Sequence, residues 1–89
     1  MRSRTTKKFR MAFSRLPNKI KEQARAAYIL FTKNPKHPSL RFKKVHSKKA
    51  IYSARISLDC RALAQLEGDE CIWFWIGSHD DYDKLLSKL

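Results

Sequence analysis

Residues 71–82 read CIWFWIGSHDDY, an apolar run that gives way abruptly to a polar one. The apolar part, residues 71–76, does not alternate with polar residues and is therefore typical of a central strand buried on both faces. A single glycine then leads into Ser-His-Asp-Asp-Tyr, where this strand should end. Polar side chains at the end of a buried strand are often functional, so this stretch bears on both the fold and the activity.

Upstream, the sequence predicts further strands that accompany residues 71–76. Residues 67–70, EGDE, indicate a turn, and residues 61–66 before it are ambiguous but fit a strand better than a helix. Residues 52–58 alternate apolar and polar side chains, which indicates a strand with one wet face. Residues 40–43, LRFK, alternate in the same way and predict one more short strand.

The first part of the chain carries helical periodicity instead. Apolar residues at helical spacing predict one helix over residues 5–16, with Thr5 or Thr6 as its N-cap, and a second over residues 17–34. A short C-terminal helix fits within residues 80–88.

The expected fold class is therefore α+β. An N-terminal helical hairpin packs on one face of a small antiparallel sheet of three to four strands, a short C-terminal helix follows, and the other sheet face is open. A chain of 89 residues builds a single domain with one modest core. Much of this core is expected to come from Phe9, Phe13, Tyr28, Phe31, Tyr52, Ile56, Phe74 and Ile76.

The net charge of +12 is unevenly spread along the chain. Residues 1–49 hold 16 lysines and arginines and one acid, a balance of +15, whereas residues 50–89 hold 4 and 7, a balance of −3. Such an excess creates a positive field of several kT at the surface. A nucleic acid or an acidic protein is therefore the expected partner.

Several classes of protein are excluded by what the sequence lacks. No apolar stretch is long enough for a membrane span, and the basic N-terminus has no apolar segment behind it as a signal peptide would. We therefore expect a cytoplasmic protein. Cys60 and Cys71 have no metal-ligand spacing and should be free thiols, so neither a metal nor a small-molecule cofactor is expected.

A basic site is expected on the open face of the sheet. Because the apolar residues of the 52–58 strand face the helices, Arg55 must point away from them. Arg61 opens the next strand and should reach the same region, and His79 and Tyr82 follow the central strand. Cations neutralise phosphates and rings stack on bases, which favours an RNA site. Further candidates for contacts with nucleic acid are Lys43, Lys44, His46, Lys48 and Lys49.

The same side chains also fit purely structural roles. Arg61 has Asp59 and Glu70 as candidate ion-pair partners. His79 is placed to cap the C-terminal helix, and Tyr82 is placed to pack on its underside. The pattern alone does not choose between the two accounts.

Three stretches together resemble one protein family. They are KNPKHPSLRFKKV (residues 33–45), IYSARISLDCRAL (residues 51–63) and WFWIGSHDDYDKLL (residues 73–86). In their order of helix, proline-containing turn, paired strands and terminal strand, they resemble the RelE-like members of the RelE/ParE superfamily of bacterial type II toxins. The resemblance covers nearly the whole chain, so residues 1–89 are expected to be a single RelE-like toxin domain.

This resemblance implies an endoribonuclease that cleaves translated mRNA at the ribosome without a metal, inhibits translation and is neutralised by a cognate antitoxin. Arg55 and Arg61 would take the cationic positions of the family, and His79 and Tyr82 the acid–base or stacking positions, with the two roles unassigned. Two rivals are a toxin of the same fold without nuclease activity, as in the gyrase-poisoning branch, and a non-catalytic basic module that binds nucleic acid or the ribosome.

The chain departs from the family pattern in two places. Family members usually begin with a strand, whereas only residues 1–4 precede the first expected helix, so an edge strand is expected to be missing. Family ribonucleases also often carry lysines on the strand that holds Ser53, so the active centre is expected to contain fewer cations.

Overall fold

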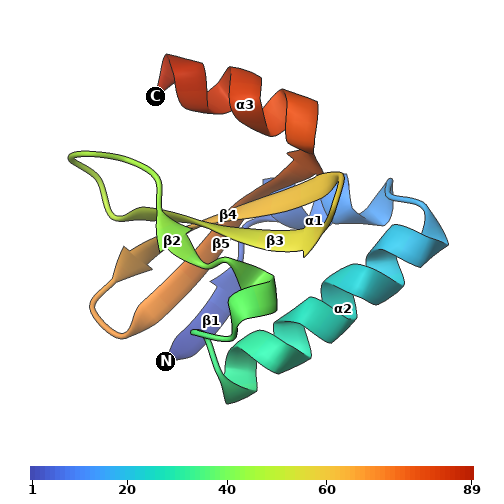
Figure 1. The fold of residues 1–89 in the computed structure, drawn as a ribbon, viewed down its shortest axis with the longest axis horizontal. Helices are drawn as coiled ribbons and strands as arrows, with labels where there is room; N and C mark the ends of the chain where they lie inside the picture. The colour runs from blue at the N-terminus through green and yellow to red at the C-terminus, as the bar shows by residue number, and fades with distance from the viewer.

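A five-stranded sheet forms the centre of the computed structural model, which describes residues 1–89 (Figure 1). The strand order is β1-β5-β4-β3-β2, with β1 parallel to β5 and all other neighbours antiparallel. The strands are β1 (Arg2–Thr5), β2 (Lys43–Lys44), β3 (Ile51–Ser57), β4 (Cys60–Glu67) and β5 (Glu70–Ser78).

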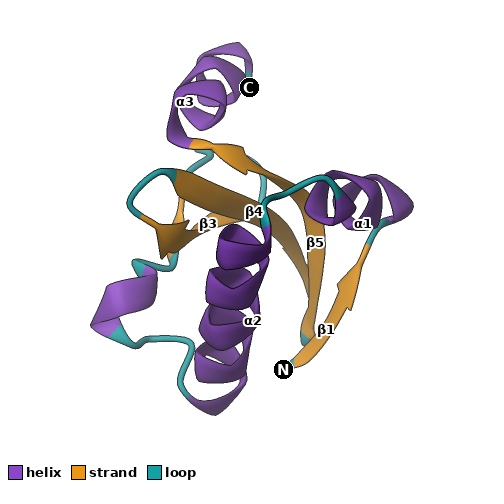
Figure 2. Cartoon of the chain, turned by 90° about the vertical axis from the view of Figure 1, so that its right-hand side faces the viewer, coloured by secondary structure: helices purple, strands orange, loops and turns teal.

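Helices cover both faces of this sheet. On one face α1 packs on β5 and α2 packs on β3, while α3 follows β5 and lies on the opposite side (Figures 1 and 2). None of the helices combines the length and apolar composition that crossing a membrane requires. The helices are α1 (Lys7–Ser14), α2 (Asn18–Lys33), α3 (His79–Lys88) and a short 3-10 helix, η1 (Pro38–Leu40).

The predicted α+β class is confirmed, with a helical hairpin on one sheet face and a short C-terminal helix. The threonine N-cap is also present, since the Thr6 hydroxyl accepts a hydrogen bond from the Phe9 N–H at 3.2 Å. The helices begin and end within a few residues of the predicted positions. The sheet, however, is mixed and has five strands rather than three or four.

The expectation that an edge strand is missing was wrong. Residues Arg2–Thr5 form β1, which runs beside β5 at the sheet edge (Figure 2). The indole N–H of Trp73 donates to the Ser3 hydroxyl at 2.8 Å, and Arg4 pairs with Glu70 at 3.3 Å. An edge strand can be held by backbone hydrogen bonds and a few polar contacts, so it shows no apolar alternation in the sequence.

The strand predicted at residues 40–43 is mostly something else. Pro38 opens the 3-10 helix η1, where its missing N–H costs nothing, and the His37 ring accepts from the Ser39 N–H at 3.2 Å. The chain then turns at Arg41, whose φ of 45° and ψ of 41° are left-handed. Of the predicted residues only Lys43 lies in a strand, the two-residue β2.

The predicted open sheet face is in fact partly covered by α3. Tyr82 is 7% exposed and packs with the buried Ile51 and Leu63, and Leu85 and Leu86 extend this contact. The apolar residues that follow the polar start of the helix at its 3.6-residue spacing explain this position. The sheet therefore has two cores, a large one under α1 and α2 and a small one under α3.

An extra residue in β5 allows the central strand to serve both cores. Leu63 pairs with Trp75 and Ala64 with Trp73, so Phe74 is a bulge without a partner. Side chains two apart on a regular strand share a face, but across this bulge Trp73 faces the helical hairpin and Trp75 faces α3. This arrangement favours glycine at position 77, because a Cβ there would lie 2.7 Å from the Trp75 ring.

Most of the predicted core residues pack as expected. Phe31 and Ile76 are buried; Phe9, Phe13 and Ile56 are partly buried against the larger core, and Phe74 against the smaller one. Tyr52 is half-buried and stacks on Phe42 at 5.1 Å between ring centroids. Tyr28 was wrongly assigned to the core, because its side chain is 45% exposed on α2.

Phe31 and Tyr28 lie on the same helix and should differ sharply in their effect on stability. Phe31 is 3% exposed, and its ring meets those of Phe42 and Trp73 at 5.0 and 5.3 Å. Phe31→Ala should lower the free energy of unfolding by about 3–5 kcal/mol, whereas Tyr28→Ala should change it by about 0.5 kcal/mol or less. Chemical denaturation measures both, and equal losses would contradict this packing.

Both cysteines are free, as predicted, and both are buried. Burial raises the pKa of the Cys60 thiol, with a smaller opposing effect of Arg61, and burial raises the pKa of Cys71 to about 11. Both thiols are therefore protonated at neutral pH and do not act as nucleophiles.

The buried Cys71 should make stability fall in alkali. An unfolded chain loses this proton near pH 9.0, whereas the folded chain keeps it to about 11. Stability is thus fully retained below the unfolded pKa and lost as the pH rises through the folded pKa, by about 2–3 kcal/mol in total. Unfolding measured from pH 8 to pH 11.5 should show this extra fall in the wild type and not in Cys71→Ala. The lysines and tyrosines titrate in both proteins, so their effect cancels in the difference between the two.

Candidate active site

A small basic pocket lies where β2, β3 and β4 meet the start of α3. Its volume is about 150 Å³, below the roughly 300–1,000 Å³ that encloses a drug-sized ligand, so it accommodates a group such as a phosphate. All four predicted catalytic residues line it, with no carboxylate among the lining side chains. The basic pocket is defined by Arg41, Lys43, Ser53, Arg55, Arg61, His79 and Tyr82.

Arg55 and Arg61 are directly opposite one another in the β3–β4 ladder. Like charges in this position repel each other, and an anion bound between them would relieve the repulsion. Arg61 Nη1 donates to the carbonyl oxygens of Ser57, Cys60 and Leu58 at 2.6, 3.1 and 3.3 Å. These carbonyls fix the guanidinium at the turn and leave its other N–H groups for a ligand.

Arg61 does not form the ion pair that the sequence analysis considered as its structural role. Neither Asp59 nor Glu70 pairs with it, and Glu70 is paired with Arg4 instead. Arg61 is therefore held by neutral carbonyls, which orient its charge without cancelling it.

His79 begins α3 and is held from two sides. Its backbone N–H donates to the Asp59 carbonyl at 2.8 Å, and its Nδ1 lies 3.1 Å from a carboxylate oxygen of Asp83. The cap of this helix is Ser78, whose hydroxyl accepts from the Asp81 N–H, so His79 is not the cap. With Nδ1–H directed at a carboxylate, the neutral ring carries its lone pair on Nε2, where it can accept a proton.

Tyr82 lies one helical turn on and combines packing with access to the pocket. Its ring is buried in the smaller core, 6.4 Å from the Trp75 ring and 5.8 Å from the His79 ring between centroids. The packing account of this residue is thus correct for the ring. The same residue also lines the basic pocket.

The predicted nucleic-acid-binding residues are only partly brought together. Lys43 lines the basic pocket, whereas Lys44, its neighbour on β2, does not. His46 organises the following loop: its Nδ1 accepts from the N–H groups of Lys48 and Lys49 at 3.0 and 2.9 Å, and its Nε2 lies 3.2 Å from the Leu89 oxygen. Lys48 and Lys49 are exposed on this loop, outside the pocket.

Sequence reasoning did not assign two of the pocket residues to the site. Arg41 was expected on the wet side of a strand, and only its left-handed backbone, which no pattern reveals, brings it to the pocket. Ser53 was named in the sequence analysis only to identify its strand and was not assigned a role. It is 3% exposed, and alternation along β3 predicts its position beside Arg55.

A second, larger cavity lies on the opposite side of the sheet. This helix groove has a volume of about 640 Å³ and a mostly apolar lining. It runs between α1 and α2, which pack on β5 and β3 and leave β4 beneath the gap. The helix groove is defined at its walls by Phe9, Phe13 and Tyr28 and at its floor by Ala54, Ala62 and Ile76.

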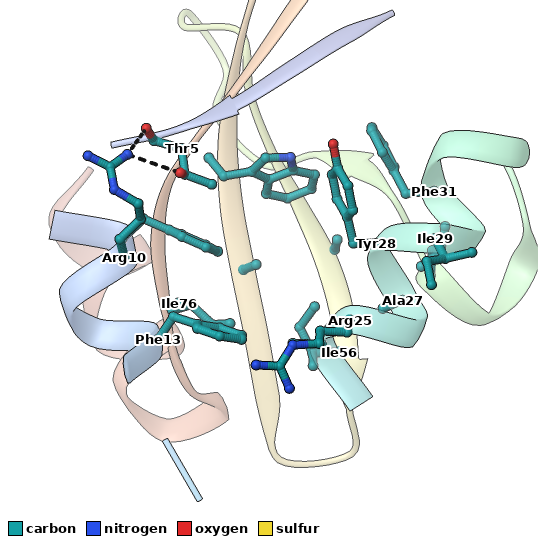
Figure 3. A pocket seen from close by; sticks show the side chains of 16 residues that line it. Thr5, Arg10, Phe13, Arg25, Ala27, Tyr28, Ile29, Phe31, Ile56 and Ile76 are labelled. Atoms are coloured by element: carbon teal, nitrogen blue, oxygen red, sulfur yellow. Dashed lines mark hydrogen bonds between the residues drawn. The ribbon is translucent and has the colours of Figure 1, made fainter. Parts of the chain in front are cut away.

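Two arginines border the helix groove (Figure 3). Arg10 Nη1 donates to the Thr5 carbonyl at 2.7 Å and to its hydroxyl at 3.1 Å. Arg25 extends from α2 toward α1, with its guanidinium carbon 5.4 Å from the centre of the Phe13 ring. The groove is apolar inside and positively charged at its rim.

The fold is that of a class of small toxins. A family model described as a ParE-like toxin domain matches residues 18–84, and the chain belongs to this family. Membership of the RelE/ParE toxin superfamily is thus confirmed. No curated protein matches the sequence significantly.

Solved toxin structures share the fold over nearly their full length. The RelB–RelE antitoxin–toxin complex from Methanococcus jannaschii has a TM-score of 0.73 at 15% identity, covering 91% of this chain and 95% of that one. For the YoeB/ParE toxin from Agrobacterium tumefaciens the values are 0.71 and 13%, with 89% and 99% covered. YafQ from Escherichia coli strain BL21(DE3) gives 0.68 and 14%, with 92% and 98% covered.

Proposed function

We propose that this toxin is an endoribonuclease that cleaves translated mRNA in the cytoplasm and so inhibits translation. The observation that carries the proposal is the basic pocket, in which two opposed arginines, a carboxylate-bound histidine and a tyrosine surround a space of phosphate size. Such a set supplies both the cations and the proton-transfer groups that cleavage beside a ribose requires.

In the proposed reaction the side chains of α3 transfer protons and the two arginines of the sheet stabilise charge. His79 Nε2 takes the proton from the ribose 2′-OH, whose oxygen forms a bond to the adjacent phosphorus. The bond from phosphorus to the 5′ oxygen breaks, which leaves a 2′,3′-cyclic phosphate on one fragment, and the 5′ oxygen of the other fragment takes the proton of the Tyr82 hydroxyl. Transfer of the proton from His79 to Tyr82 through water then restores both side chains. Arg55 and Arg61 stabilise the additional negative charge on the phosphoryl oxygens during this exchange.

Rates of variants separate this chemistry from simple binding. Arg61→Ala should lower cleavage about a hundredfold by removing charge stabilisation, and His79→Ala should lower it about 10²–10⁴-fold by removing proton transfer. Lys84→Ala is the matched control, because Lys84 is exposed on the same helix and outside the pocket. The assay is cleavage of a reporter mRNA during cell-free translation, with thermal midpoints measured alongside.

One result would refute the assignment of the activity to the basic pocket. If growth arrest and mRNA cleavage both survive the combined loss of Arg61, His79 and Tyr82, the pocket does not carry the activity. Growth arrest without any mRNA cleavage by the wild type would instead indicate a toxin of this fold that acts without nuclease chemistry.

We further propose that a cognate antitoxin neutralises the toxin by inserting an acidic amphipathic helix into the helix groove. The similar M. jannaschii toxin was solved with its antitoxin. In this chain the apolar floor and the exposed ring of Tyr28 suit apolar anchors, and Arg10 and Arg25 at the rim suit carboxylates. Residues 1–33 carry ten lysines and arginines and one acid, which strengthens the charge complementarity.

A charge placed in the helix groove should disrupt this complex. Tyr28→Glu puts a carboxylate against the apolar floor and should weaken antitoxin binding at least about tenfold, with little effect on folding because the side chain is exposed. Met11→Glu is the control, since Met11 is 48% exposed on α1 and outside the groove. Titration calorimetry with the product of the adjacent gene measures both. Equal affinities for the two variants would exclude the groove, and antitoxin docking over the basic pocket or in place of α3 would then be the alternative.

A further inference from the structure

Arg41 is the one non-glycine residue of the chain with a positive φ. At a φ of 45° and a ψ of 41° its Cβ crowds the backbone, and glycine or asparagine is the usual occupant of this region. Residues held in sparsely populated backbone conformations cluster at functional sites, where the side chain is needed in a particular place. The backbone conformation of the turn therefore does not explain why this position holds an arginine.

The neighbours of Arg41 show how the conformation is maintained. Leu40 is 2% exposed, and the Phe42 ring lies 5.0 Å from that of Phe31 between centroids. The Arg41 N–H donates to the Pro38 carbonyl at 3.2 Å. Both flanking side chains are thus fixed in the core, and the left-handed turn between them lets Arg41 line the basic pocket. Glycine would fulfil the backbone requirement, so what arginine adds is its charge.

The charge of Arg41 is unpaired in the protein. The ion pairs of the structure are Arg4 with Glu70 and His79 with Asp83, and no hydrogen bond involves the Arg41 guanidinium. Arg41 is exposed, whereas Arg55 and Arg61 are half-buried deeper in the same pocket. Arg41 precedes the edge strand β2, whereas the proposed proton-transfer groups lie on another element, α3.

We propose that Arg41 binds the RNA backbone at the phosphate next to the one that is cleaved. The inference rests on the proposed ribonuclease function and adds to it a residue that sets the position of the strand. Arg55 and Arg61 already surround a space that accommodates a single phosphate. The exposed guanidinium of Arg41 at the mouth of this space is therefore placed to meet the flanking phosphate and to contribute to binding rather than to the chemical step.

Salt dependence of binding provides a direct test. The probe is a short single-stranded RNA with 2′-O-methyl riboses, which lacks the attacking hydroxyl and cannot be cleaved. Each phosphate contact on a single strand contributes about 0.7 to the slope of log K against log salt concentration. Arg41→Asn should therefore reduce the slope by about 0.7, and Arg41→Lys should retain it. Lys36→Asn, an equal loss of charge in the same loop but outside the pocket, should leave the slope unchanged.

Two further measurements distinguish a binding role from a structural one. In the translation assay Arg41→Asn should raise KM at least about fivefold with kcat near the wild-type value, whereas His79→Ala should lower kcat. The thermal midpoint of Arg41→Asn should not fall, because asparagine tolerates the left-handed region. If this variant folds poorly, Arg41→Gly must give the same loss of slope.

The proposal fails if Arg41→Asn and Arg41→Gly keep the wild-type slope, or if the variants lower kcat while leaving KM unchanged. It also fails if Lys36→Asn reduces the slope as much, since the effect would then come from net charge. A wild-type protein that shows the Arg41-dependent slope but cleaves no mRNA refutes the ribonuclease and leaves the phosphate contact. If the wild type cleaves mRNA and the Arg41 variants keep its slope and its KM, this inference alone is refuted.

Discussion

The pairing of β4 with β5 across the Phe74 bulge is the constraint on which the rest of the molecule depends. The bulge reverses which face the later side chains of β5 occupy, so Trp73 closes the core under the helical hairpin and Trp75 contributes to the core under α3. Without it Trp75 would face the hairpin, and α3 would lose part of the surface on which Tyr82 packs. Gly77 belongs to the same arrangement, because only a residue without a Cβ fits beneath the displaced indole.

The elements that could be predicted from the sequence are those with a clear apolar periodicity. Two helices, the central strand and the alternating strand before it were all recognised, and with them the positions of Arg55, Arg61, His79 and Tyr82 near one site. Strand alternation fixes the face of Arg55, and the chain order fixes which strand end carries His79. These placements follow from local rules that the fold does not override.

What the sequence did not reveal depends on contacts between distant segments. β1 is polar along its length and exists because β5 offers it hydrogen-bonding partners, so its residues give no strand signal. The cover of α3 over the second sheet face depends on a few apolar residues in a short, acidic helix. Tyr28 has the helical spacing of a core residue, but its side chain lies at the gap between α1 and α2. The small alanines of the sheet beneath this gap do not fill it, so the tyrosine stays partly exposed. The turn at Arg41 is set by the packing of Leu40 and Phe42 and leaves no trace in composition.

The way in which α3 is attached to the sheet has a consequence for the local stability of the basic pocket. This helix holds His79 and Tyr82 but rests on the sheet through a handful of side chains, with the His46 ring at its far end as one more attachment. The larger core, under α1 and α2, contains no residue of α3. Local opening of such a unit needs less free energy than global unfolding and would be seen as faster amide hydrogen exchange in α3 than in β4. Opening of α3 would separate the pocket side chains on this helix from the arginines on the sheet, so the two halves of the basic pocket differ in local stability.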